Sequence, residues 1–395
     1  MQSAGEFFRQ AVSELKEKNL DWKIRVLGGP SSARGLIDGK NSIILCSNNY
    51  LGLSNHPKLK RAAVQAIKKY GVGSGSVRTI AGTMDLHVQL EKKISEFKHS
   101  EAALFFQTGF AANAGLIPAL AGEGDLIISD ELNHGSIIDG VRLSKAERAV
   151  FKHKDTEELK KILEESQAKN YKKILIITDG VFSMDGDIAP MKEIVKLAGQ
   201  FNAITYVDDA HGEGVLGDHG RGIASHFGLE GKIDVEMGTF SKAFGVVGGY
   251  VSGSKSLCEF ALNKSRTFLL SGSHPPAVAA ACIASLELLE GSDKYVRKLW
   301  RNTRYFKKKL KKLGFNTGES QTPITPVMLE DSALAQNFAR ELFGEGIFTI
   351  PIVYPMVAQG KARIRTMITA AHKKEDLNEA LNAFDKVGKK LNVLK

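Results

Sequence analysis

Short apolar runs alternate with helical patterns between about residues 100 and 255, and this alternation constrains the fold more than any other feature of the chain. Runs of this length fit buried strands, and the segments between them have helical spacing. Such alternation is typical of an α/β fold in which helices wrap a mostly parallel sheet, with the loops after the strands on one edge. The expected strands are 102–106, 125–129, 174–178, 203–207 and 248–252, and the expected helices are 111–120, 156–168 and 189–199.

The two ends of the chain differ from this central region. Near the N-terminus, Gly28-Gly29-Pro30 interrupts a helical pattern and a short β-rich stretch follows, which predicts an N-terminal arm over residues 1–51. After Pro275-Pro276, two long amphipathic helices precede a mixed β and helical tail. We therefore expect a large domain over residues 52–287 and a smaller α+β C-terminal domain over residues 288–395.

Composition excludes several classes of protein. With 395 residues, 43% of them hydrophobic and 25% charged, the chain has enough apolar material for a large core and is neither disordered nor fibrous. Three scattered cysteines indicate neither a disulfide framework nor a metal site, and no apolar stretch predicts a signal peptide or membrane helix, so a cytoplasmic protein is expected. The net charge of +10 includes lysine-rich helix faces, which are usually solvated surface, and it does not by itself indicate a nucleic-acid partner. The same charge could attract an anionic substrate such as coenzyme A, but charge alone does not choose between these explanations.

Two short segments point to a pyridoxal phosphate (PLP) enzyme. Asp208-Asp209-Ala210-His211 follows an apolar strand, and Thr239-Phe240-Ser241-Lys242 follows later. PLP chemistry needs a lysine amine to hold the aldehyde as a Schiff base, and an anion against the pyridine nitrogen to keep the ring protonated. Lys242 and Asp208 supply these two groups, and His211 is expected near the phenolic oxygen of the ring. A lone lysine or a strand-ending aspartate is usually a surface or capping residue, so the combination carries the prediction.

A competing motif lies in the same segment. Residues 212–217 spell the dinucleotide fingerprint Gly-x-Gly-x-x-Gly, which raises the alternative of a nicotinamide oxidoreductase. That fingerprint requires an amphipathic helix directly after it, whereas residues 218–222 read Asp-His-Gly-Arg-Gly, which is turn chemistry. We therefore reject a dinucleotide site.

Further residues complete a predicted cofactor pocket. Thr108-Gly109-Phe110 lies between a strand and a helix, where free backbone N–H groups favour a phosphate, and Thr239 adds a hydroxyl. His134 is an aromatic suited to stacking on the ring, and Ser183 is suited to binding the phenolic oxygen. Near the C-terminus, one of the arginines of Arg363-Ile364-Arg365 is suited to binding the carboxylate of an amino acid.

Taken together, these motifs resemble the α-oxoamine synthase family of fold type I PLP enzymes, over nearly the whole chain from about residue 25 onward. The resemblance implies the PLP-dependent transferase fold with a large domain, a small C-terminal domain and an N-terminal arm. The matching segments are 47–53, 109–113, 130–134, 179–186, 208–214, 239–242 and 363–372.

The resemblance also implies a role for each matched residue. Lys242 would carry the cofactor, Asp208 would pair with the pyridine nitrogen, His134 would stack on the ring, and Ser183 and His211 would contact the phenolic oxygen. The phosphate would lie among Thr108, Gly109, Phe110 and Thr239, and the substrate carboxylate would lie between Asn49 and Arg365. No metal ion is expected.

Members of this family are homodimers with shared active sites, so the resemblance implies that residues 71–76 and Ser271-Gly272-Ser273 reach the site of the partner subunit. This chain departs from the family at Gly272, where members usually carry a polar side chain. The departure leaves a side-chain contact to the neighbouring phosphate in doubt.

The implied activity is the condensation of an amino acid with an acyl-coenzyme A. We favour glycine with acetyl-coenzyme A, the reaction of glycine C-acetyltransferase (2-amino-3-ketobutyrate coenzyme A ligase). The alternatives are alanine with pimeloyl-coenzyme A, the decarboxylating reaction of 8-amino-7-oxononanoate synthase, or relaxed specificity for both. A fold type I aminotransferase would use the same lysine and aspartate, and a non-catalytic PLP-fold regulator is the least favoured reading.

Overall fold

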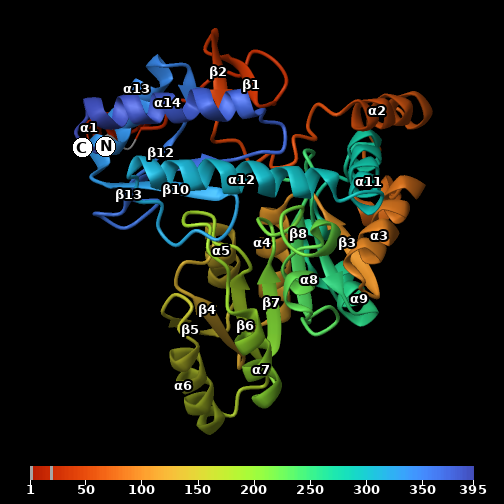
Figure 1. Ribbon diagram of the computed structural model, residues 1–395. Helices are drawn as coiled ribbons and strands as arrows, with labels where there is room; N and C mark the ends of the chain where they lie inside the picture. Colours follow the sequence, from red (N-terminus) through yellow and green to blue (C-terminus); the bar gives the residue numbers. More distant parts are fainter. Residues whose placement is uncertain (1–2, 18–20) are drawn as a thin grey trace.

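A central sheet of seven strands organises the chain. The structure is a computed structural model that describes residues 3–17 and 21–395. The strand order is β3-β9-β8-β7-β6-β4-β5, and β9 alone runs antiparallel to its neighbours, so the expected mostly parallel sheet is confirmed (Figure 1). The strands are β3 (Ala102–Phe106), β4 (Leu126–Asp130), β5 (Glu147–Phe151), β6 (Ile174–Asp179), β7 (Ile204–Asp208), β8 (Val235–Thr239) and β9 (Gly249–Gly253).

Both faces of this sheet are buried, because apolar residues of one strand point alternately to two helical layers. In β6, Ile174 and Ile176 join one hydrophobic cluster, whereas Leu175 and Ile177 join the other. The first layer contains α2 (Pro57–Tyr70), α3 (Asp85–Lys98), α6 (Thr156–Ser166), α7 (Met191–Gln200), α8 (Ile223–Phe227) and α11 (Pro276–Glu290), and the second contains α4 (Gly109–Leu120), α5 (Gly135–Leu143), α9 (Lys255–Lys264) and α10 (Arg266–Leu269).

The C-terminal elements form a separate hydrophobic cluster, which α12 (Lys294–Leu313) links to the central sheet (Figure 1). Val296 and Leu299 of α12 pack in the cluster of the central sheet, and Phe306 and Leu310 pack in the C-terminal one. The other elements of the C-terminal part are β10 (Ile324–Glu330), α13 (Ser332–Gly344), β11 (Ile347–Phe348), β12 (Pro351–Ile352), β13 (Ala362–Met367) and α14 (Lys374–Lys390).

The N-terminal segment pairs with this C-terminal part. After α1 (Ala4–Glu17), β1 (Arg34–Ile37) and β2 (Lys40–Ile44) form a hairpin, and β11 extends it as a third strand parallel to β2. A second small sheet has the order β10-β13-β12. The boundaries expected at residues 51/52 and 287/288 stay a prediction.

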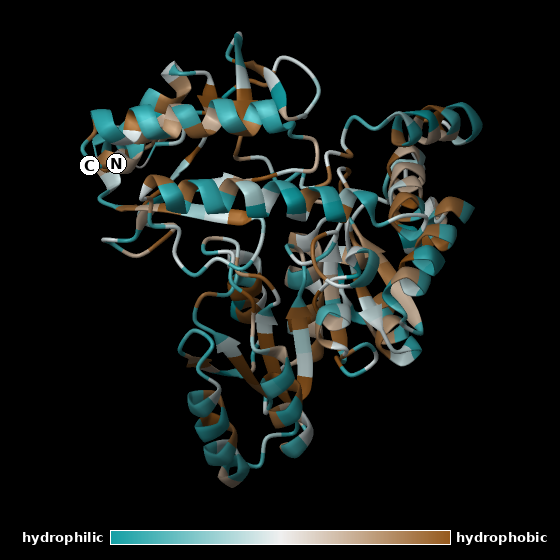
Figure 2. Cartoon of the chain, viewed as in Figure 1, coloured by the Kyte–Doolittle hydropathy of each residue, from teal (hydrophilic) through white to brown (hydrophobic). Residues whose placement is uncertain are grey.

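Two strands of the central sheet were missing from the expected set, and both depart from a purely apolar pattern. β5 is an edge strand whose side chains are mostly exposed, and β8 contains the buried Glu236 and Gly238. Figure 2 shows brown, apolar segments on the central strands and a teal, polar stripe along α12, which agrees with a buried sheet and an amphipathic linking helix. Within the described residues, no helix combines the length and apolar character needed to cross a membrane.

Candidate active site

Three neighbouring strands of the central sheet end in polar residues that face one cavity. Asp179 ends β6, Asp208 ends β7 and Thr239 ends β8, and the register pairs Asp179 with Asp208. The cavity has a volume of about 190 Å³. Nine of the predicted site residues line it, which are Thr108, Gly109, Phe110, His134, Ser183, Asp208, His211, Thr239 and Lys242, together with Ser136, Asp179, Ala210, Met237 and Ser241.

The carboxylate of Asp208 is fixed by hydrogen bonds to both oxygens. Asn113 Nδ2 donates to Oδ2 at 2.8 Å, and the backbone N–H of Ala210 donates to Oδ1 at 3.0 Å. Asn113 is itself held by Tyr206, whose hydroxyl donates to Asn113 Oδ1 at 2.7 Å. All of these groups are buried, so the carboxylate is held in one orientation and retains lone pairs for a ligand in the cavity.

Lys242 lies in a tight loop after β8 and reaches the same cavity. Burial lowers the pKa of its amine, while the carboxylates of Asp208 and Asp179 oppose that effect and the guanidinium of Arg365 adds to it. The unprotonated amine is therefore more accessible at neutral pH than for an exposed lysine, and an unprotonated amine is the form that attacks an aldehyde. The loop is closed by hydrogen bonds from Phe240 N to Gly248 O and from Val246 N to Phe240 O.

His134 caps the N-terminus of α5 and faces the cavity. Its Nδ1 accepts the backbone N–H of Ser136 at 3.2 Å, and its own backbone N–H donates to Asp179 Oδ2 at 2.8 Å. Burial lowers the pKa of the imidazole, as do the charges of Lys242 and Arg365, whereas Asp208 raises it. A neutral ring whose Nδ1 and backbone N–H are both hydrogen-bonded is suited to stacking on a planar ligand.

His211 is buried and pairs with a tyrosine. Its Nδ1 lies 2.8 Å from the hydroxyl oxygen of Tyr50. Burial lowers the pKa of His211 well below its usual value, and the positive charges of Lys242 and Arg365 act in the same direction. The imidazole is therefore neutral at pH 7.

The N-terminus of α4 forms the other end of the cavity. Thr108 Oγ1 accepts the N–H of Ala111 at 3.0 Å, which caps the helix and leaves the N–H groups of Gly109 and Phe110 at the first turn for an anion. The hydroxyl of Thr239 donates to Gly248 O at 2.7 Å, so in this structure its proton is used within the lysine loop.

Five predicted residues lie outside the cavity lining. Arg365 is close to it, because its Nη1 donates to the carbonyl of Ser183 at 2.9 Å and its charge acts on Lys242. Asn49 is buried, donating to Ser31 O at 3.3 Å, and accepts the N–H of Ser54. The remaining three are Ser271, Gly272 and Ser273.

The segment 271–273 is joined to residues 74–77, which overlap the other segment expected at a partner subunit, 71–76. Ser273 Oγ lies 2.6 Å from Ser74 Oγ, and Val77 and Gly272 form an isolated β-bridge. A Cβ built on Gly272 has no neighbour within 4 Å, so a side chain would fit at this position.

Some residues of the site were not predicted from the sequence. Asn113 is a buried amide in an otherwise apolar helix, and Asp179 ends a strand as Asp208 does, so both carried a readable signal. Burial and the charge of Asp208 raise the pKa of Asp179 well above its usual value. Tyr50 lies in the matched segment 47–53 but was given no role, and Tyr206 lies in no matched segment. The hydroxyls of both meet partners that are distant in the sequence.

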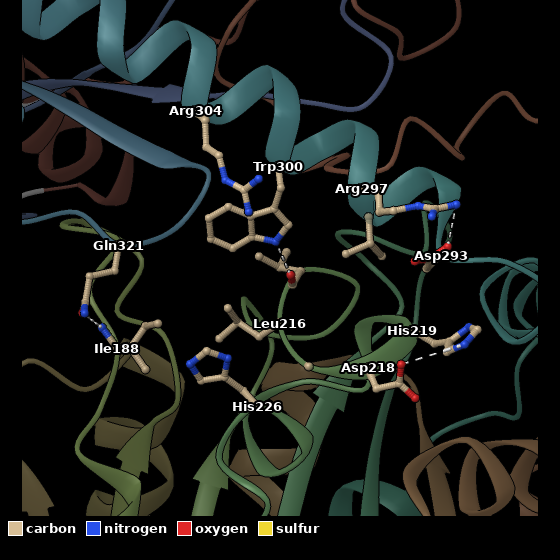
Figure 3. Close-up of a pocket in the computed structure, with 13 residues that line it drawn as sticks. Ile188, Leu216, Asp218, His219, His226, Asp293, Arg297, Trp300, Arg304 and Gln321 are labelled. Atoms are coloured by element: carbon tan, nitrogen blue, oxygen red, sulfur yellow. Dashed lines mark hydrogen bonds and ion pairs between the residues drawn. The ribbon is translucent and has the colours of Figure 1, made fainter.

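A larger cavity of about 700 Å³ lies elsewhere, between α12 and the loop that follows β7 (Figure 3). Trp300 donates its indole N–H to Val215 O at 2.7 Å, and Arg297 pairs with Asp293. None of the predicted site residues lines it. Size alone therefore does not identify the site, and the convergence of titratable groups favours the smaller cavity.

The smaller cavity fits PLP in three respects. It offers a lysine amine of lowered pKa for the aldehyde, a fixed carboxylate for the ring nitrogen, and a helix N-terminus for the phosphate. Residues 212–217, by contrast, form turns and bends and are followed by a three-residue 3-10 helix, Asp218–Gly220. They therefore lack the amphipathic α-helix that a dinucleotide site requires directly after the fingerprint.

Comparisons with known proteins agree with this chemistry. A family model described as aminotransferase class I and II matches residues 40–384. A relative from Thermoanaerobacter pseudethanolicus, named 8-amino-7-oxononanoate synthase, is 57% identical over 98% of this chain and 98% of its own. A serine palmitoyltransferase variant from S. paucimobilis, solved with a PLP–myriocin aldimine, has a TM-score of 0.93 at 32% identity over the whole of both chains. The 8-amino-7-oxononanoate synthase of Francisella tularensis has a TM-score of 0.76 at 28% identity, covering 88% of this chain and 98% of its own.

Proposed function

This chain belongs to the α-oxoamine synthases, PLP-dependent enzymes within the aminotransferase class I and II family, and we propose that it is an 8-amino-7-oxononanoate synthase. It would join alanine to pimeloyl-coenzyme A and release coenzyme A and carbon dioxide. The observation that carries the choice of substrates is the name of a relative that is 57% identical over 98% of both chains. Glycine with acetyl-coenzyme A, favoured from the sequence, has no such support and becomes the second candidate.

Asp208 and Lys242 would have different roles in this reaction. Bound PLP supplies an electron sink for the bond that breaks at the α-carbon of the amino acid. Asp208, fixed by Asn113, would hold the proton on the ring nitrogen. The amine of Lys242, with its pKa lowered by burial, would accept the α-proton as a general base.

The other predicted residues would orient the reactants. His134 would stack on the ring as a neutral imidazole, and His211 and Ser183 would contact the phenolic oxygen. Arg365 lies beside the Ser183 carbonyl and would bind the substrate carboxylate, with Asn49 nearby in the same role. Thr108, Gly109, Phe110 and Thr239 would surround the phosphate.

A homodimer with shared sites is part of the proposal. The joined segments 74–77 and 271–273 carry exposed apolar neighbours, with Val72, Ile80 and Leu270 exposed by 79%, 82% and 68%. Exposed apolar groups beside two joined segments favour a protein interface, and a second copy is the partner that the family resemblance implies. The cytoplasm stays the expected compartment, in agreement with three free cysteines, Cys46, Cys258 and Cys282.

Release of the coenzyme A thiol tests the proposed function. PLP-loaded protein is offered glycine, alanine or serine, each with acetyl- or pimeloyl-coenzyme A, and the Lys242→Ala variant serves as the control. We expect the highest kcat/KM for alanine with pimeloyl-coenzyme A, and no release by the variant. Preference for glycine with acetyl-coenzyme A would select the second candidate, and no release with any pair would favour an aminotransferase.

A further inference from the structure

A buried cluster of charges lies directly behind the candidate active site. The ammonium group of Lys98, whose side chain is 1% exposed, contacts Glu236 at 2.9 Å, Glu213 at 3.4 Å and Asp209 at 3.6 Å. Burial alone disfavours the charged lysine, but the three carboxylates together raise its pKa. Burying one ammonium with three acids has a high desolvation cost, and nothing in the reaction described above uses this cluster.

Glu213 differs from the other two acids in what its oxygens bind. Its Oε2 accepts the backbone N–H of Thr239 at 3.1 Å, and its Oε1 accepts the hydroxyl of Tyr250. Asp209 instead accepts the N–H of Ile223 at 2.8 Å, at the start of α8 and away from the lysine loop. Within the cluster, Glu213 is therefore the carboxylate bonded to the strand end that leads to Lys242.

The sequence position of Glu213 makes this bond a link between two parts of the site. Glu213 follows His211 by two residues, in the loop that begins directly after Asp208, and its own backbone N–H donates to Asp209 O at 3.0 Å. Thr239 ends the adjacent strand and opens the loop of Lys242. The side chain of Glu213 therefore connects the loop after Asp208 with the loop that contains Lys242.

The neighbouring backbone leaves room for this link. A Cβ built on Gly238 would lie 2.2 to 2.5 Å from the carboxylate atoms of Glu213, which is closer than any real contact. Glycine at position 238 therefore allows the carboxylate to approach the N–H of residue 239, and a larger residue would displace it.

We propose that Glu213 is a positioning residue, which holds the Lys242 loop against the Asp208 loop through the backbone N–H of Thr239. Burial raises the pKa of Glu213, and the ammonium group of Lys98 opposes that effect. In its charged form the carboxylate also favours the protonated amine of Lys242. The inference rests on the proposed function only in requiring PLP on Lys242, and it holds whichever acyl group the enzyme uses.

The test measures cofactor binding in the holoenzyme. Glu213→Ala removes both the charge and the acceptor, and we expect a dissociation constant for PLP about tenfold higher, since hydrogen bonds to charged groups of this kind are worth about that factor. Glu213→Gln retains an acceptor for Thr239 N–H without the charge. For this variant we expect PLP affinity within about threefold of the parent, and a lower pH midpoint for the absorption change of the lysine-bound cofactor.

Glu236→Gln is the matched control, because it removes one carboxylate from Lys98 while leaving the bond to Thr239 intact. We expect PLP affinity and the pH midpoint of this variant to equal those of the parent. The proposal would fail if Glu213→Ala bound PLP as tightly as the parent does. It would also fail if Glu236→Gln showed the weaker PLP binding of Glu213→Ala and the lower pH midpoint of Glu213→Gln, because the cluster would then have only a structural role. If Glu213→Ala does not fold, the pH midpoints of Glu213→Gln and Glu236→Gln are compared instead. A lower midpoint in Glu213→Gln alone supports the positioning role, and equal midpoints in the two variants indicate a structural role.

Discussion

At the scale of single residues, the candidate site depends on side chains that never face the ligand. Asn113 donates to Asp208 and to Ser136 Oγ, each at 2.8 Å, and accepts the hydroxyl of Tyr206. Through these bonds one amide orients the carboxylate expected at the ring nitrogen and the serine that contacts His134. Because Asn113, Asp208, Tyr206 and Ser136 are all buried, removal of one of these side chains leaves others without partners.

Asn113→Ala tests this network. It leaves the hydroxyl of Tyr206 and one oxygen of Asp208 unpaired, so we expect the free energy of unfolding to fall by about 1 to 3 kcal/mol. We also expect kcat to fall by about tenfold, because Asp208 loses its fixed orientation. Urea unfolding and steady-state kinetics measure the two effects.

Tyr206→Phe is the control for this prediction, because it removes one hydroxyl and leaves the bond from Asn113 to Asp208 intact. It is expected to lower stability while kcat stays near that of the parent. Equal losses of kcat in the two variants would contradict an orienting role for Asn113.

At the scale of elements, sequence periodicity predicted the part of the fold that is most strongly apolar. Strands such as β6, with every residue buried, and β7 were predicted because their apolar runs have no other explanation than burial. β8 was missed because Glu236 reads as a surface residue, and only its contact with Lys98 across the fold explains its burial. The same limit applies to Tyr50 and His211, which are 161 positions apart.

A buried histidine ties the end of the β13 region to the N-terminal hairpin. His372 is fully buried, with Nδ1 accepting the N–H of Thr369 at 3.0 Å and Nε2 donating to the carbonyl of Ile44 at 3.1 Å. Burial lowers its pKa from 6.5 to about 4. The unfolded chain therefore binds a proton that the folded chain excludes, so stability is complete above pH 6.5 and falls as the pH drops toward 4.

From these values we expect His372 to remove about 2 kcal/mol of unfolding free energy between pH 7 and pH 5. His372→Asn, whose amide oxygen can still accept the N–H of Thr369, should lose this part of the pH dependence. Urea unfolding at both pH values measures it, with His99→Asn at the exposed end of α3 as the control. The same pH dependence in His372→Asn and in the parent would refute the assignment.

At the scale of the whole molecule, the cavity lies at the strand ends of the large sheet, beside elements of the C-terminal part. Arg365 of β13 donates to Ser183 in the loop after β6, and Arg363 of the same strand donates to Met184 O at 3.1 Å. The relative placement of the two parts therefore determines where the substrate carboxylate would bind. The segments joined by Ser74 and Ser273 lie outside the lining, and the proposed dimer would place them at the site of a second copy.

Leu270→Arg tests the proposed dimer. Size-exclusion chromatography with light scattering is expected to show a dimer of the 43.0-kDa chain. Leu270 is 68% exposed, so an arginine at this position should weaken the dimer without disturbing the core. We expect the variant to dissociate at about tenfold higher protein concentration than the parent and to lose PLP on dissociation. A monomeric parent that retains PLP and full activity would contradict shared sites.

The fate of the alanine carboxyl carbon tests the central claim most directly. Holoenzyme is given pimeloyl-coenzyme A and alanine labelled with ¹³C in its carboxyl group, and the products are analysed by mass spectrometry. Decarboxylating condensation predicts an amino-oxo acid without the label, with labelled carbon dioxide and free coenzyme A in equal amounts. A product that keeps the label, or no product from this pair while glycine and acetyl-coenzyme A react, would contradict the proposed synthase.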